Sequence, residues 1–352
     1  MGHQVEVISL KKDAREMLDA LLKTSVLFRP DAIMGMNHVG MDTEGIIPNT
    51  LAEFQLPLVI WYLDDFRFLI PNPGSLVTPY SVIFTFEKKH VPLLKSIGFE
   101  HVYYLPSATA YNPTTDYKAA FPQFHYLENA VSFVGTTFHY TRQKLEKPAF
   151  ARYFREFAAH HTFTAHIPNL VDQLEREQKS RFAESSQFYK YCGFVVSVAT
   201  EQYRLHYLKS ITEKPFYVVG DRRWLELGVP AEYLPPTQYE TETPAVYAHS
   251  QINLNLSSMQ LASTVSLRPF DVSAAGGFLL SDHTETLYEL FDPEEIPSFR
   301  SPEEMNDLIR FYRQHPELRQ KAASKARQRV IAHHQIHHRM ETILETLKHL
   351  WQ

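Results

Sequence analysis

Short apolar runs alternate with helical stretches over the first third of the chain, and this alternation constrains the fold most. We expect strands at residues 4–10, 32–36, 58–63, 81–86 and 101–105, and the spacing of apolar residues predicts helices at 13–24 and 91–97. Short buried strands separated by helices are typical of a parallel sheet with both faces covered. We therefore predict a doubly wound, Rossmann-like first half.

A second series of the same kind follows residues 106–129, which contain several prolines and lack clear periodicity, as a linker does. We expect strands at 130–134, 215–219, 251–256 and 277–280, a helix-rich stretch at 140–202, and helices at 303–314, 316–334 and 339–350. The predicted fold is α/β, with two Rossmann-like domains facing each other across a cleft (GT-B type) and C-terminal helices. The predicted domains are 1–110 and 130–335, with a linker at 111–129 and a closing helix at 336–352.

Composition and charge exclude several classes of protein. The net charge is −5, from 35 basic and 40 acidic residues, and no concentrated basic face suggests nucleic-acid binding. No apolar stretch is long enough to span a bilayer, and Glu6 interrupts the short apolar run at the start, so no signal peptide is expected. The single Cys192 fits a reducing cytoplasm and is expected to be a packing residue rather than a nucleophile.

The most informative segment is 266–282, SLRPFDVSAAGGFLLSD. A helix that begins near Arg268 and Pro269 offers free N–H groups to a diphosphate, and the Asp271 carboxylate can accept hydrogen bonds from two ribose hydroxyls. The alternative is a helix-to-strand turn whose glycines permit tight packing, and composition alone favours that alternative.

The order of several motifs adds a resemblance to this interpretation. Segments 133–142 (FVGTTFHYTR), 252–257 (INLNLS), 266–282, 287–293, 299–330 and 334–340 resemble the C-terminal domain of the spore-maturation-type (CgeB-like) glycosyltransferase family, which has a GT-B fold. Segments 28–42, 56–65 and 104–109 are similar to its N-terminal half. The family commonly has Glu at the position of Asp271. Residues 2–8 (GHQVEVI) resemble the second strand of such a domain, which implies that its first strand and helix are missing from this sequence. The alternative is that 4–9 is simply the first strand.

The resemblance implies transfer of a sugar from a nucleotide diphosphate sugar, bound by the C-terminal domain, to an unidentified acceptor that is a saccharide, a protein or a small molecule. Asp271 would bind the ribose, and other residues would surround the phosphates or the nucleoside. For the turn at 135–137, an ordinary strand-to-helix connection is an equal alternative. The predicted donor-binding residues are Asp271, Arg268, Gly135, Thr136, Thr137, Arg142, Gly220, Thr264 and Ser266.

A base in the first half would remove the proton from the acceptor hydroxyl. Asp64 and Asp65 follow a predicted strand, and because adjacent side chains on an extended chain point apart, we expect one of the two to reach the site. The alternative role is an N-cap. His38 is the rival base, with a backbone-bonded loop histidine as its alternative role, and Asp42 is a further candidate.

No cofactor beyond the donor is expected. Four histidines (333, 334, 337 and 338) fall at helical spacing, but no carboxylate or Cys joins them at a familiar metal-ligand spacing, so we predict no metal site. Two rival functions remain. One is a non-catalytic nucleotide- or sugar-binding protein, which Asp in place of Glu at 271 favours. The other is a different GT-B-like enzyme, such as a sugar epimerase or phosphorylase.

Overall fold

The computed structural model describes residues 2–70 and 72–351, which form two compact α/β units. The first unit runs to Pro106 and also includes Glu177–Cys192. The second unit holds Ser107–Arg176 and the chain from Gly193 onward. In the described part of the chain, no helix is both long and apolar enough to cross a membrane.

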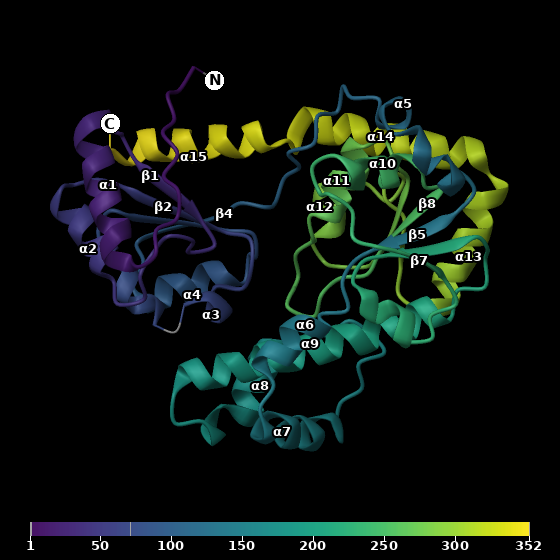
Figure 1. The fold of residues 1–352 in the computed structure, drawn as a ribbon, viewed down its shortest axis with the longest axis horizontal. Coiled ribbons are helices and arrows are strands. Elements are labelled where there is room, and N and C mark those ends of the chain that lie inside the picture. Colours follow the sequence, from purple (N-terminus) through teal and green to yellow (C-terminus); the bar gives the residue numbers. More distant parts are fainter. Residues whose placement is uncertain (1, 71, 352) are drawn as a thin grey trace. The chain divides into compact units, whose positions relative to one another are not determined.

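The first unit is built on a parallel sheet with the strand order β1-β2-β3-β4 (Figure 1). Neighbouring strands pair in register from Ile33 with Leu58 and from Leu58 with Ser81. The strands are β1 (Ile33–Met36), β2 (Leu58–Tyr62), β3 (Ser81–Thr85) and β4 (His101–Tyr104), and the helices are α1 (Ala14–Phe28), α2 (Ile46–Glu53), α3 (Phe66–Leu69) and α4 (His90–Ile97), with a 3-10 turn η1 (Pro73–Leu76).

Alternate residues of the central strands form the core of the first unit. Leu58, Ile60 and Tyr62 of β2 point to one face, as the two-residue period of a strand requires. Apolar side chains of α1, α2 and α4 pack against them, and all of these strand residues are fully buried. The strands β1 to β4 confirm the strands predicted at 32–36, 58–63, 81–86 and 101–105.

The predicted strand at residues 4–10 is wrong, because this segment forms neither helix nor strand. Its alternating Val5 and Val7 are 77% and 82% exposed, so the pattern does not bury them against a sheet. A strand is stable only where its backbone groups pair with a neighbour. The hydrogen-bonded partner of β1 is β2. An alternation of apolar and polar residues is therefore not enough to form a strand at residues 4–10.

The second unit contains six parallel strands in the order β10-β9-β8-β5-β6-β7. They are β5 (Val131–Val134), β6 (Phe216–Val219), β7 (Glu232–Leu234), β8 (Ile252–Asn255), β9 (Leu279–Asp282) and β10 (Ser298–Phe299). The sheet grows from β5 through β6 to β7 on one side, and β8 then returns to the other side of β5. The strand order thus reverses beside β5, and such a switch point is where open α/β sheets bind ligands, at the carboxyl ends of the strands.

Several helices of the second unit, among them α10, α11 and α14, lie beside this sheet (Figure 1). The interior of α11 is fully buried and packs against α10 and α14. The helix-rich stretch at 140–202 and the three C-terminal helices are confirmed, whereas β7 and β10 were not predicted. The remaining helices of the chain are α5 (Tyr117–Ala120), α6 (His139–Leu145), α7 (Pro148–Ala158), α8 (Leu170–Gln178), α9 (Ser185–Lys209), α10 (Glu242–His249), α11 (Arg268–Ala274), α12 (Leu287–Leu290), α13 (Pro302–Gln314), α14 (Pro316–His333) and α15 (Ile336–Trp351), with 3-10 turns η2 (Pro122–Leu127), η3 (Lys179–Arg181) and η4 (Arg222–Glu226). Of these, η3, the end of α8 and the start of α9 fall within the first unit.

Candidate functional site

Arg268 lies at the switch point of the second unit, where β5 and β8 end. One guanidinium nitrogen, Nη1, donates a 2.5 Å hydrogen bond to Oδ1 of Asn255, the last residue of β8. Ser266 donates to the same oxygen at 3.2 Å. The guanidinium carbon lies 5.6 Å from the centre of the Phe133 ring in β5. Arg268 is therefore held at the carboxyl ends of the two central strands, where a positive charge suits an anionic ligand.

Two glycines bring the ends of β5 and β6 into direct contact. A Cβ atom on Gly220 would lie 2.1 Å from the carbonyl oxygen of Gly135, so no other residue fits at position 220 without a backbone shift. The Trp224 indole N–H donates to the same carbonyl at 2.8 Å. A Cβ on Gly135 would come within 3.4 Å of Nη2 of Arg268. Both glycines thus adjoin the switch point, and the donor-binding role expected for them stays a prediction.

The threonines of the turn after β5 are engaged within the protein. Thr137 donates from its backbone N–H and its hydroxyl to the Asp221 carboxylate, at 2.5 and 2.8 Å. Asp221 also caps η4 by accepting from the Arg223 N–H. The Thr136 carbonyl accepts a hydrogen bond from Arg204 at 2.7 Å. These contacts connect two loops at the end of the sheet, as the alternative of an ordinary strand-to-helix connection at 135–137 would. A phosphate-binding role for the two threonines stays a prediction.

Arg204, near the C-terminal end of α9, is a second guanidinium at this edge of the sheet. It is buried, and its hydrogen bonds go to the carbonyl oxygens of Thr136 and Leu256. Its guanidinium lies 5.4 Å from the Phe133 ring centre, the same ring that Arg268 contacts. Burial, and then the nearby charge of Arg268, lower the pKa of Arg204 to about 9. The edge of the sheet therefore holds two guanidinium groups beside one aromatic ring.

Asp271 lies in the first turn of α11, one helical turn beyond Arg268, and is 2% exposed. The Tyr239 hydroxyl donates a 2.7 Å hydrogen bond to its Oδ2. Burial raises the pKa of Asp271 to about 7, although hydrogen bonds from Thr109 and Tyr239 and the charge of Arg268 act in the opposite direction. A carboxyl group that ionises near neutral pH is characteristic of functional sites.

Two further predicted donor residues are buried or paired within the protein. Arg142 forms an ion pair with Glu201 at 2.8 Å and also contacts His139. Thr264 is buried in the loop between β8 and α11.

Of the histidines at the end of α14, His334 contacts Arg339 and packs on the Phe270 ring. Burial, and then the charge of Arg339, lower the pKa of His334 to about 4.

Sequence reasoning missed Asp282 at the end of β9, which organises the neighbouring loop. Its carboxylate accepts hydrogen bonds from the Ser257 backbone N–H at 2.7 Å, from the Tyr203 hydroxyl at 2.9 Å and from Asn255 at 3.1 Å. The signal in the sequence was an acidic residue at the end of an apolar strand. Its partners come from separate elements, so the sequence could not show that this carboxylate is structural.

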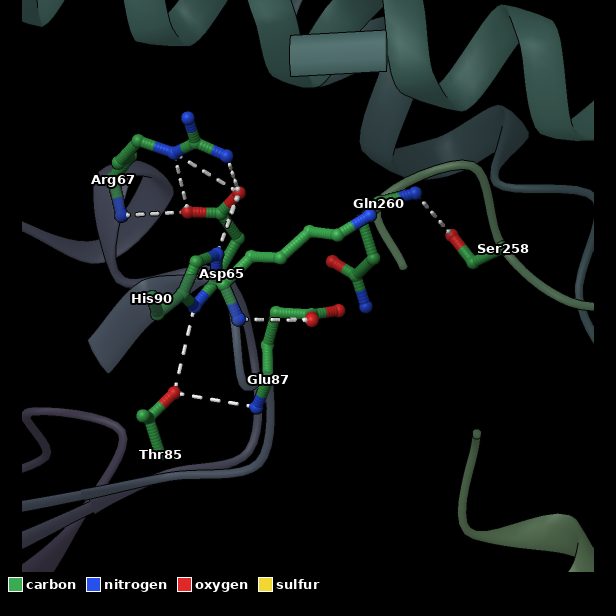
Figure 2. A network of polar contacts seen from close by, with 8 residues as sticks. Asp65, Arg67, Thr85, Glu87, His90, Ser258 and Gln260 are labelled. Atoms are coloured by element: carbon green, nitrogen blue, oxygen red, sulfur yellow. Dashed lines mark hydrogen bonds and ion pairs between the residues drawn. The ribbon is translucent and has the colours of Figure 1, made fainter. Parts of the chain in front are cut away.

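In the first unit, Asp65 is the centre of a buried ionic network (Figure 2). Arg67 donates to its Oδ2 from Nη2 at 2.7 Å, and the His90 Nε2 lies 3.6 Å from the same oxygen. The Thr85 hydroxyl contacts His90 from the other side, at 3.5 Å (Figure 2). Asp65 also caps α3 by accepting from the Arg67 N–H. Burial opposes ionisation, but His90 and Arg67 outweigh it and hold the pKa of Asp65 well below its usual range.

The other predicted bases gather where β1 and β2 end. Asn37 donates to the Asp64 carboxylate at 2.8 Å, and its own side-chain oxygen accepts from the Leu63 backbone N–H at 2.7 Å. His38 is buried, and its Nε2 lies 3.1 Å from the Asp42 carbonyl oxygen. Since a carbonyl can only accept, Nε2 carries the proton and Nδ1 keeps its lone pair. Burial lowers the pKa of His38, against the opposing effects of the bond to Asp42 and the Asp42 charge.

Within the described residues, Nδ1 of His38 is buried and makes no hydrogen bond. The Asp42 carboxylate accepts from the backbone N–H groups of Ile46 and Ile47, at 2.6 and 2.7 Å, and so holds the start of α2. Three of the four base candidates therefore differ in what their side chains contact. Asp65 forms an ion pair with Arg67, and Asp42 accepts hydrogen bonds from the start of α2. His38 has a neutral imidazole with one basic nitrogen, Nδ1.

Comparison with solved structures defines the class of fold. The sucrose-phosphate synthase of Thermosynechococcus elongatus aligns with a TM-score of 0.55 over 96% of this chain and 78% of its own, at 12% identity. HepE of Anabaena, solved in complex with UDP-glucose, aligns with a TM-score of 0.53 over 94% of this chain and 81% of its own, at 11% identity. A glycosyltransferase of Rickettsia africae aligns with a TM-score of 0.55 over 99% and 85%, at 10% identity. The fold of this chain is that of the GT-B glycosyltransferases, with two parallel α/β sheets.

The family comparison concerns the second unit. Residues 202–345 match a family described as "Glycosyl transferase-like", and this range contains β6 to β10, Arg268 and Asp271. A search of curated proteins finds no match. The glycosyltransferase-like assignment expected from the sequence is thus supported at the level of this family, and the spore-maturation-type subfamily stays an expectation.

Proposed function

We propose that this chain transfers a sugar from a nucleotide diphosphate sugar to an acceptor hydroxyl, with the donor bound by the second unit. The observation that carries the proposal is the position of Arg268, Asn255 and Asp271 at the carboxyl ends of β5 and β8, where the strand order reverses. The "Glycosyl transferase-like" match over residues 202–345 and structural neighbours solved with UDP and UDP-glucose support this choice of ligand.

In this proposal the donor is held by two charges of opposite sign. The Asp271 carboxylate accepts hydrogen bonds from the ribose hydroxyls, and the Arg268 guanidinium donates to the diphosphate. Gly135 and Gly220 let the ends of β5 and β6 meet beside that guanidinium, and the proposal places the diphosphate at these strand ends. The nearby Arg204 adds to the positive potential. Thr136, Thr137, Thr264 and Ser266 stay proposed as further phosphate neighbours, and Arg142 is the weakest of the predicted set because Glu201 already pairs with it.

The reaction exchanges one bond to the anomeric carbon for another. The acceptor oxygen forms a bond to that carbon, the bond to the diphosphate oxygen breaks, and the diphosphate leaves with the electron pair. Arg268 stabilises the charge that develops on the leaving group. The proton of the acceptor hydroxyl must pass to a base, and the spore-maturation-type resemblance assigns that step to the first unit.

Among the base candidates of the first unit, we favour His38. Because Nε2 carries the proton, Nδ1 has a free lone pair. The lowered pKa of His38 keeps the imidazole neutral near pH 7. Asp65 is the least suitable, because Arg67 and His90 stabilise its ionised form and so weaken it as a base. Asp64 keeps a carboxylate at the end of β2, held by Asn37. The rival function is nucleotide or sugar binding without transfer, and the engagement of Asp65 in an ion pair is the observation that favours it.

The first experiment is calorimetric titration of the chain with UDP, GDP and ADP, followed by assays of hydrolysis and transfer with the sugar form of whichever nucleotide binds. Asp271→Ala should weaken nucleotide binding by about 1–3 kcal/mol, since a charged hydrogen-bonding partner is lost. Asp307→Ala, which removes an exposed carboxylate on α13, is the matched control. Unchanged affinity in a folded Asp271→Ala variant would refute the ribose assignment, and binding without turnover over a broad acceptor panel would favour the rival function.

A further inference from the structure

Tyr239 covers the carboxylate to which we assign the ribose. Its hydroxyl donates to Oδ2 of Asp271 at 2.7 Å, and Asp271 is 2% exposed whereas Tyr239 is 45% exposed. Tyr239 therefore lies between the carboxylate and the solvent. It belongs to residues 235–241, which connect β7 to α10 without forming helix or strand. Such a connection can move without disrupting the sheet.

A second tyrosine holds Tyr239 in this position. The hydroxyl of Tyr111 donates to the Tyr239 carbonyl oxygen at 2.8 Å, and the two ring centres are 5.1 Å apart. Tyr111 itself is buried in the core of the second unit beside Tyr117 and Phe270. The backbone carbonyl of Tyr239 is thus held by a hydrogen bond from the Tyr111 hydroxyl. Its side chain is held by the hydrogen bond that its own hydroxyl donates to Asp271.

The bond from Tyr239 to Asp271 is chemically the bond that a ribose would make, a hydroxyl donating to a carboxylate oxygen. A ribose cannot reach a carboxylate that is almost completely covered while the covering ring stays in place. We infer that Tyr239 is a latch, which occupies the ribose-binding carboxylate in the ligand-free chain and is displaced when a nucleotide binds. This inference rests on the proposed function, because it needs Asp271 to be the ribose ligand.

Displacement of the latch reduces the observed affinity, because the bond between Tyr239 and Asp271 is lost when the nucleotide binds. Tyr239→Phe keeps the ring but removes the competing hydroxyl, so UDP should bind about fivefold more tightly, the equivalent of one net hydrogen bond. If Tyr239 instead stayed beside the ribose and shared the carboxylate, the same substitution would weaken binding. The direction of the change thus separates a latch from an ordinary contact residue.

The test is calorimetric titration with UDP of the full chain and of the variants Tyr239→Phe, Asp271→Asn and their combination. The latch predicts tighter binding for Tyr239→Phe alone and a smaller effect of Tyr239→Phe in the Asp271→Asn background, because a neutral carboxamide oxygen accepts a weaker hydrogen bond than a carboxylate. Tyr288→Phe is the matched control, since it removes a partly exposed tyrosine hydroxyl that donates to Ser298 in the same unit. Unchanged or weaker binding by Tyr239→Phe, while Asp271→Asn weakens binding, overturns the latch and leaves the proposed function intact.

If Asp271→Asn has no effect on UDP affinity, the ribose assignment and the latch both fail. A further variant covers the case in which Tyr239→Phe does not fold. Tyr111→Phe removes the bond to the Tyr239 carbonyl without touching Asp271, and it should also tighten UDP binding because the latch is held less firmly. A folded Tyr111→Phe variant with wild-type or weaker affinity contradicts the inference.

Discussion

The stability of the ligand-free chain should depend on pH through Asp271. A carboxyl group of this type has a pKa of 3.8 when unperturbed, and burial raises it to about 7 in the folded chain. The folded chain thus holds the Asp271 proton more tightly than the unfolded chain. Its contribution to the free energy of unfolding is complete below about pH 4 and is lost as the pH rises through 7.

The magnitude follows from the two pKa values. They differ by about three pH units, and each unit is worth roughly 1.4 kcal/mol, so the ionised carboxylate costs about 4 kcal/mol in total. Between about pH 5.5 and 8 the wild type should lose roughly 2 kcal/mol of this contribution. Asp271→Asn cannot ionise and should not lose it, whatever constant difference its altered hydrogen bond introduces.

Urea unfolding of both proteins at about pH 5.5 and 8, followed by circular dichroism, provides the measurement. The free energy of unfolding of Asp271→Asn, relative to the wild type, should rise with pH. Asp307→Asn removes an exposed carboxylate from α13 and should follow the wild type at both pH values. A difference between Asp271→Asn and wild type that is the same at both pH values would refute a neutral, buried Asp271.

Three further predictions concern the site and its supports. Ribose hydroxyls favour the ionised form of Asp271, so UDP-glucose affinity should rise by up to about tenfold from pH 6 to 8, with proton release in calorimetry; a flat profile would contradict this. Gly220→Ala places a Cβ 2.1 Å from a backbone oxygen and should lower stability by about 1–3 kcal/mol in thermal unfolding, whereas Gly193→Ala, which meets only the end of a side chain, should cost less. Asp65→Asn leaves the buried Arg67 guanidinium without its carboxylate and should cost about 3–5 kcal/mol by urea unfolding; a loss below 1 kcal/mol would show that the pair is not structural.

Apolar runs predicted the sheets well because parallel strands are buried on both faces, so β2 and β3 appear in the sequence as continuous hydrophobic segments. The same reasoning failed at residues 4–10, where pairing with a neighbouring strand decides the outcome. The position of Asp271 near the start of a helix was predictable from the segment 266–282. Its partner Tyr239 was not, because 32 residues separate them and the connection between β7 and α10 has no periodic pattern.

The choice between neighbouring carboxylates also lay beyond the sequence. Asp64 and Asp65 are adjacent in the chain, yet their environments are opposite in character. Asp65 turns inward to Arg67 and to His90, which arrives on another helix, while Asp64 contacts Asn37 from the end of β1. Long-range contacts of this kind set the pKa of Asp65, and no local motif records them.

The two guanidiniums beside the Phe133 ring have a consequence for the lifetime of the protein. Arg204 donates its hydrogen bonds to carbonyl oxygens, and the positive charge of Arg268 repels the positive charge of Arg204. An anion bound at Arg268 offsets this repulsion in the folded chain alone, and a ligand that binds only the folded state protects it from unfolding. Under the proposed function, proteolytic degradation of the chain should therefore slow when nucleotide sugar is abundant, so that the supply of substrate would help to set the amount of enzyme.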